Sequence, residues 1–168
     1  MVKKLFLAAL MLLPLTAFAQ KFATVDIEGV FGLMPETAEM QTKLEDASKQ
    51  YETAFQSLTE EIDKLYKDYQ AIADDATVLD TIKERRIQEI QERTQNAEKF
   101  RATAQQDLAR QQQQLMAPIL QKLNDAISAV GQEGSFTLIF PMNQEIILYS
   151  GADVVDATPL VKAKLGLK

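Results

Sequence analysis

The longest pattern in the chain is a heptad-like repeat of apolar residues that starts near residue 36. No glycine or proline occurs from residue 36 to residue 117. The repeat positions are Met40, Leu44, Ala47, Tyr51, Phe55, Leu58, Ile62, Leu65, Tyr69 and Ile72. One extra four-residue interval, from Tyr51 to Phe55, interrupts the alternation of three and four and locally unwinds a supercoil. The repeat predicts a helix over residues 36–73, which would be about 57 Å long at 1.5 Å per residue.

A short polar segment, residues 73–80, separates this helix from a second one. Its Asp74, Asp75 and Thr77 favour turns and N-caps, because their side chains hydrogen-bond to nearby backbone. Helical periodicity then resumes at Leu79, Ile82, Ile87, Ile90, Ala97, Phe100, Ala104, Leu108 and Leu115. Two long helices joined by a short turn predict an antiparallel hairpin. The second helix is rich in glutamine, a good helix former, and we interpret its glutamines as a solvated face.

Pro118 lies inside this second helix, where a proline is costly because it removes a backbone hydrogen bond. The helix is polar before Pro118, and its apolar density rises after it. We therefore expect a kink at Pro118, where the helix joins a folded body. The glycines at positions 131 and 134 are expected to end the helix.

Apolar segments near both ends of the chain predict that body. Residues 21–28 alternate like a half-buried strand, and a small helix or turn is expected before Pro35. Residues 136–140 and 145–150 predict two strands, around the turn at residues 141–144. Both strands are apolar on both faces, so both faces should be buried. A short capped helix is expected to follow Thr158.

The predicted fold class is therefore α+β. A small β-containing body is formed by residues 20–35 and 119–168, and a coiled-coil-like helical hairpin, residues 36–118, is inserted as an arm. A body of this size buries little surface and is marginally stable alone. Strands with two apolar faces also need more cover than one short helix provides, so we expect self-association.

The first 19 residues have the features of a secretory signal peptide. They combine Lys3 and Lys4, an apolar run, and Ala17-Phe18-Ala19 as a cleavage site after Ala19. The alternative is a membrane anchor, but the apolar run is shorter than a spanning helix and Pro14 interrupts it. We expect export to the periplasm and no stable membrane insertion of the mature chain.

Composition argues against catalysis. The chain has no histidine and no cysteine, which excludes a Ser-His-Asp triad, a thiolate nucleophile and zinc sites built from Cys and His. It has no glycine-rich phosphate loop. With 24 acidic against 18 basic residues, it has no general affinity for nucleic acid. We expect no enzyme activity and no catalytic, cofactor-binding or metal-binding residues.

Taken together, the sequence resembles the Skp/OmpH family of periplasmic chaperones for outer-membrane proteins. The matching segments, in chain order, are the signal peptide, ATVDIEGVF (23–31), LMPE (33–36), KLYKDYQ (64–70), LMAPILQKLNDAISAVGQEG (115–134) and ILYSGADVVDATPLVKAKL (147–165). The last segment, with Asp153, Asp156 and its capped helix, is the most specific.

The resemblance implies a homotrimer that holds an unfolded outer-membrane β-barrel protein between three projecting arms, without ATP. The strands would join the three chains. The residues that we expect in the trimer core are Val25, Ile27, Phe31, Leu138, Phe140 and Ile147. The alternative function is a structural or adaptor coiled-coil protein of the cell envelope.

Client contact is expected to depend on aromatic residues of the arm. The candidates are Tyr51, Phe55, Tyr66, Tyr69 and Phe100. Heptad spacing favours the seam between the two helices for most of them, whereas Tyr66 lies off the repeat and is the better candidate for an exposed contact. Residues 60–99 carry 11 acidic and 7 basic residues, unlike the basic arm tips of the best-known members. This acidic arm disfavours contact with acidic lipid.

Overall fold

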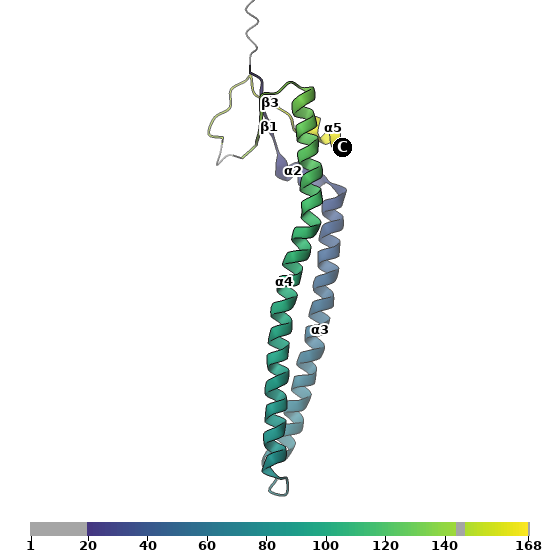
Figure 1. Cartoon of the computed structure of the whole chain (residues 1–168), viewed down its shortest axis with the longest axis vertical. Helices are drawn as coiled ribbons and strands as arrows, with labels where there is room; N and C mark the ends of the chain where they lie inside the picture. The colour runs from purple at the N-terminus through teal and green to yellow at the C-terminus, as the bar shows by residue number, and fades with distance from the viewer. Residues whose placement is uncertain (1–19, 144–146, 168) are drawn as a thin grey trace, which may run out of the picture. The chain divides into compact units, whose positions relative to one another are not determined.

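The computed structural model describes residues 20–143 and 147–167, so the predicted signal peptide lies outside the described residues. Its elements are β1 (Phe22–Val25), α2 (Ile27–Leu33), α3 (Pro35–Ala73), α4 (Asp80–Glu133), β2 (Leu138–Pro141), β3 (Val155–Asp156) and α5 (Thr158–Leu165) (Figure 1). The α+β class is confirmed: long helices accompany a small three-stranded sheet built from the chain ends.

The chain divides into two compact units. Residues 20–27 and 126–166 form the sheet unit, and residues 28–125 form the helical unit. The sequence placed the boundaries of the arm at residues 36 and 118. In the structure the helical unit is longer than the predicted arm at both ends. It also includes residues 28–35, which hold most of α2, and residues 119–125 of α4.

Helix α3 begins at Pro35, where the missing N–H of proline costs nothing because first-turn amides have no partner within the helix. The side chain of Thr37 holds this start, since its hydroxyl donates to the carbonyl of Phe31 at 2.7 Å. From Met40 to Ile72, the residues that are not fully exposed are the ten repeat positions of the sequence. The predicted seam of α3 is confirmed, and α3 lies beside α4 in Figure 1.

The turn between the two helices is held by Asp75. Its Oδ1 accepts hydrogen bonds from the Thr77 backbone N–H at 2.8 Å and from the Thr77 hydroxyl at 2.6 Å. The ammonium group of Lys83 donates to the carbonyl of Ala73 at 2.8 Å, across the same turn. The break predicted at residues 73–80 is confirmed, and a local side-chain acceptor produces it.

We predict that this turn makes stability depend on pH. The two donors of Thr77 lower the pKa of Asp75 from its ordinary value. A carboxyl with a lowered pKa in the folded state stabilises above its unfolded pKa, and this contribution is lost as the pH falls from about 4 through the folded pKa. Urea unfolding between pH 5 and pH 3 should therefore show a shallower pH dependence in Asp75→Asn than in the parent. Asp74→Asn removes the same charge one residue away and should keep the parent slope; equal slopes in all three chains would contradict the prediction.

Helix α4 continues without a break through Pro118 and ends in a tight C-terminal cap. The N–H of Phe136 donates to the carbonyl of Gly131 at 3.0 Å, and Ser135 adopts a left-handed φ of 51°. This is the Schellman arrangement. A Cβ on Gly134 would meet the Phe136 ring at 2.3 Å, so glycine is required there. The expected end near Gly134 is confirmed, whereas Gly131 is still helical.

Pro118 should be a local weakness of α4. The helix is already continuous there and Pro118 is exposed, so replacing it with alanine restores a backbone N–H without burying anything new. We expect Pro118→Ala to raise the free energy of unfolding by about 1–2 kcal/mol, less than the full helix-interior cost of proline because the unfolded chain also gains freedom. The measurement is denaturant unfolding followed by circular dichroism. A loss of stability would mean that the proline serves packing which alanine cannot reproduce.

The sheet has the strand order β2-β1-β3, and both pairings are parallel. Phe22 pairs with Leu138 and Ala23 pairs with Val155. As the central strand, β1 is buried on both faces rather than half-buried: Ala23, Thr24 and Val25 are all buried. The strand is also shorter than predicted, because Ile27 begins α2.

The prediction of a second C-terminal strand at residues 145–150 is wrong for residues 147–150, which are irregular; residues 144–146 lie outside the described residues. The third strand is β3 instead. Since β2 and β3 occupy both edges of β1, no edge of the central strand remains for another segment. The expectation that both faces of β2 are buried does not hold within one chain, because Leu138 and Phe140 are 51% and 39% exposed.

The core of the sheet unit is made of small residues, and α5 covers part of it. Its buried apolar residues are Ala23, Val25, Ala126, Val130, Ala157 and Val161. Thr158 joins α5 to the sheet, because its hydroxyl accepts from the Asp26 N–H at 3.0 Å. The helix ends at Gly166, whose φ of 71° is left-handed. The short helix predicted after Thr158 is confirmed, but the predicted cap is wrong: Thr158 is the first residue of α5, and Ala157 before it makes no side-chain cap.

Candidate functional site

Three aromatic residues of the helical unit, Tyr51, Phe55 and Phe100, lie together at one point of the α3–α4 seam. The Tyr51 ring packs edge-on against Phe100, with ring centroids 6.0 Å apart and an interplanar angle of 62°. This geometry places the positive edge of one ring against the negative face of the other. Phe55 follows one turn later on α3 and is half-buried.

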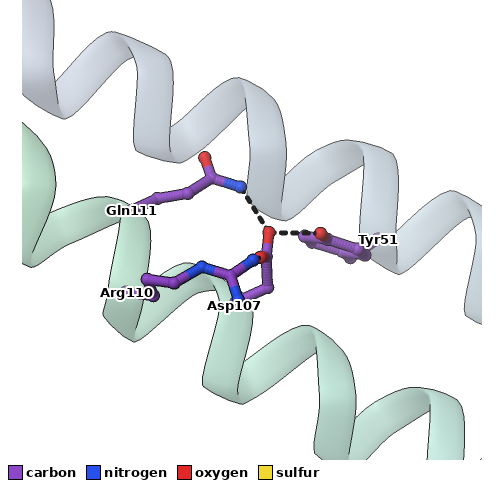
Figure 2. A network of polar contacts seen from close by, with 4 residues as sticks. All are labelled: Tyr51, Asp107, Arg110 and Gln111. Atoms are coloured by element: carbon purple, nitrogen blue, oxygen red, sulfur yellow. Dashed lines mark hydrogen bonds and ion pairs between the residues drawn. The ribbon is translucent and has the colours of Figure 1, made fainter.

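A polar cluster lies beside these rings. Figure 2 shows Tyr51 of α3 reaching Asp107 of α4, and the hydroxyl donates to Asp107 Oδ2 at 2.6 Å. On α4 itself, Gln111 Nε2 donates to the same oxygen at 2.5 Å, and Arg110 forms an ion pair with Oδ1. The Asp107 side chain is only 16% exposed, so these donors replace most of its hydration. This cluster was not predicted from the sequence, where the available signal was an acidic residue at seam spacing from Phe100 and Ala104.

A shallow notch opens next to the cluster. It has a volume of about 220 Å³, and its apolar wall comes from Tyr51, Phe55, Phe100, Ala104 and Leu108. Apolar side chains of a bound chain could lose contact with water here without displacing the helices. The notch brings together three of the five predicted client-contact residues.

The remaining two candidates differ in exposure. Tyr69 is half-buried in the seam, whereas Tyr66 is 52% exposed. The structure therefore places Tyr51, Phe55, Tyr69 and Phe100 in the seam and Tyr66 on the surface, the distribution that heptad spacing indicates. Their contact with a client stays a prediction.

Charged residues connect the two helices at both ends of this region. Arg93 and Glu61 form an ion pair at 3.3 Å, and Lys122 pairs with Glu36. The hydrogen bond from Lys122 lowers the pKa of Glu36. The net-acidic α3 thus pairs with basic residues of α4, as the charge balance of the two segments favours.

The sheet unit carries several large apolar side chains that are exposed to solvent. Its exposed side chains are Leu138, Phe140, Met142, Leu148 and Tyr149, of which the last two are 91% and 87% exposed. Phe140, Leu148 and Tyr149 line a groove of about 460 Å³ together with Phe22, Thr24, Ile147, Ser150 and Val154. A patch of this kind on a small unit indicates a contact surface. We refer to the groove lined by these residues as the sheet-unit groove.

The residues predicted for a trimer core fall into three groups. Leu138 and Phe140 are exposed, and Ile27, Phe31 and Ile147 are half-buried. Val25 is 1% exposed and already belongs to the core of its own chain, so it has little surface left for a second chain. Leu138, Phe140 and Ile147 therefore carry the prediction of a contact between chains.

The described residues contain neither a metal-binding cluster nor a membrane-spanning helix. Within residues 20–143 and 147–167, no group of three or more acidic, histidine or cysteine residues is arranged to hold a metal ion. No helix in the same part of the chain is both long enough and apolar enough to cross a membrane.

The fold defines a class of protein in which a long antiparallel helical hairpin is inserted into a small α+β unit made from both chain ends. The sequence matches the family described as outer membrane protein (OmpH-like) over residues 21–165. The chain therefore belongs to the OmpH-like family, and the resemblance seen in the sequence is confirmed.

A solved structure has the same fold. It is the crystal structure of a candidate outer membrane chaperone (OmpH-like) from Caulobacter crescentus CB15, with a TM-score of 0.74 and 16% sequence identity. The alignment covers 87% of this chain and 83% of that one. No curated protein matches the chain.

Proposed function

We propose that the chain is an ATP-independent holdase chaperone of the periplasm, which binds unfolded outer-membrane β-barrel proteins and prevents their aggregation. The observation that carries this proposal is membership of the OmpH-like family over residues 21–165. The fold shared with a candidate outer membrane chaperone supports it. The predicted signal peptide supports the periplasmic location.

The exposed sheet-unit groove supports self-association, with a homotrimer as the expected assembly. Among the described residues, strand β2 has a neighbouring strand on one side only, and its Leu138 and Phe140 are exposed to solvent. Edges of this kind pair readily with another chain. Joining three chains here would bury apolar residues that one chain leaves in water.

The helical unit supplies the client-binding surface in this proposal. Tyr66 and the notch beside Tyr51 offer apolar area, and the surrounding charge is net acidic. Binding would consist of many weak apolar contacts, each of which buries only part of an apolar side chain. Such contacts suit an unfolded barrel, whose strands expose alternating apolar residues.

A comparison of folded and unfolded partners tests this function. A holdase should bind a fluorescently labelled β-barrel protein diluted from urea and should not bind the same protein folded in detergent. The structural or adaptor alternative predicts no binding of the unfolded form, since a spacer recognises one folded partner. Fluorescence anisotropy with both forms, in the absence of ATP, separates the two functions.

A further inference from the structure

At the interruption of its heptad repeat, α3 carries two aromatic seam residues in succession, Tyr51 and Phe55. The extra four-residue interval puts Tyr51 and Phe55 one helical turn apart on the same side of α3. Either ring could pack against Phe100 of α4 after a shift of α3 by up to one turn, because apolar contacts are non-directional. Ala104, which lines the notch together with both rings, is small and offers little shape to choose between them.

The polar cluster around Asp107 favours Tyr51 over Phe55 in the contact with α4. Asp107 accepts a hydrogen bond from the Tyr51 hydroxyl at 2.6 Å, while the Tyr51 ring contacts Phe100 seven residues away on α4. Phe55 has no hydroxyl and cannot make the first contact. If Phe55 took the place of Tyr51 beside Phe100, Asp107 would lose the hydrogen bond from the tyrosine hydroxyl. Water could not easily replace this donor, because only 16% of the Asp107 side chain is exposed. A half-buried carboxylate that loses a hydrogen bond is destabilised.

We propose that Asp107 selects the alignment of α3 against α4, by accepting the Tyr51 hydroxyl at the interruption of the heptad repeat. Asp107 is thus a positioning residue of the hairpin. Gln111 and Arg110 hold its carboxylate in place from the same helix (Figure 2). The arrangement works like a single polar residue in a coiled-coil seam, which fixes register at some cost in stability. It also keeps Tyr51 and Phe100 together in the notch.

The experiment measures alignment directly. Since the chain has no cysteine, Thr59→Cys on α3 and Glu98→Cys on α4 carry spin labels at two exposed positions only. The labelled chain is mixed with an excess of unlabelled chain, so that only distances within one chain are recorded. The parent should give one narrow distance. Tyr51→Phe and Asp107→Ala should each add a second component, displaced by up to one helical turn, about 5.4 Å.

Three further variants distinguish the selection of one helix alignment by Asp107 from a general loosening of the α3–α4 seam. Asp107→Asn keeps an oxygen that accepts from Tyr51 and should restore the single parent distance. The exchange Tyr51→Phe/Phe55→Tyr moves the hydroxyl by one turn, and the second component should become dominant. Tyr69→Phe removes a hydroxyl from another seam tyrosine and should leave the parent distance unchanged.

A parent-like distance in Tyr51→Phe would overturn the proposal, because the hydroxyl would then select nothing. An equal second component in Tyr69→Phe would also overturn it, since loss of any seam hydroxyl would suffice. If Asp107→Ala fails to fold, Tyr51→Phe and the exchange still decide the question, because both keep the carboxylate and the ring packing.

Discussion

Phe140→Asp is expected to convert the proposed trimer to monomers at micromolar concentration. Phe140 lies on edge strand β2, is 39% exposed in the single chain and lines the sheet-unit groove. If another chain covers this groove, the new carboxylate has to be buried without a partner, which costs several kcal/mol. Each of three equivalent contacts would carry this cost, so dissociation should be essentially complete. Multi-angle light scattering of the mature chain gives the mass directly.

A matched control places the same charge elsewhere. Ile87→Asp changes an apolar residue of similar exposure, 37%, in α4 of the helical unit, and should leave the mass unchanged. Far-ultraviolet circular dichroism should show that Phe140→Asp keeps most of its helix, because α3 and α4 do not depend on β2 for their seam. A parent that is a stable monomer would remove the premise, and a trimeric Phe140→Asp would place the contact elsewhere.

The second large effect concerns salt. The affinity for an acidic unfolded barrel is expected to hold or rise as salt increases, whereas a basic chaperone would lose affinity. Residues 60–99 carry 11 acidic and 7 basic residues, so an acidic client is repelled most strongly at low salt, where screening is weak. Apolar contacts are not weakened by screening. The measurement is client affinity titrated from low to high salt.

Removal of apolar contacts should act cumulatively in the same assay. Tyr66→Ser alone is expected to weaken binding by about 1 kcal/mol, given about 25 cal/mol per Å² and partial burial. A variant that also changes Leu79 and Ile82, two exposed apolar residues near the turn, should lose affinity in proportion to the number of apolar residues removed. A steep loss of parent affinity with salt would contradict this account. Such a loss would indicate that the basic residues Lys83, Arg85 and Arg86 near the turn bind the client.

The hairpin could be predicted from the sequence because its determinants are local. The ten repeat positions of α3 have a 3.6-residue period that a buried stripe requires, and Asp75 with Thr77 forms the turn through bonds two residues apart. On α4 the pattern was less informative. Leu79, Ile82 and Ile87 fit the periodicity but are exposed, whereas the half-buried residues there include Lys83 and Arg86, whose apolar stems can be buried while their charged groups stay in water.

The sheet depended on pairings between distant segments, which periodicity does not report. Residues 136–140 and 145–150 look like a hairpin around a turn, yet β2 pairs in parallel with β1, more than a hundred residues away in the sequence. Strand β3 has only two residues, too few for any alternation, and its pairing with Ala23 and Thr24 defines it. The apolar character of Leu148 and Tyr149 belongs to the exposed surface of the sheet-unit groove.

The sequence predicted which aromatic residues are candidate client contacts, but it did not predict the cluster that Tyr51 forms with Asp107. Aromatic residues at heptad spacing indicated the seam, and Tyr66 stood out because it lies off the repeat. The role of Asp107 depends on a hydrogen bond to a residue 56 positions away, which a one-dimensional pattern does not contain. An acidic residue at seam spacing was the only available signal.

Aggregation of a β-barrel protein diluted from urea tests the central claim most directly. Light scattering is followed with and without the mature chain, without ATP, and with Ile87→Asp and Phe140→Asp as matched variants. The account predicts that the parent and Ile87→Asp suppress scattering at about one trimer per client, and that Phe140→Asp suppresses it far less. Unchanged scattering in the presence of a trimeric parent chain would contradict the holdase function.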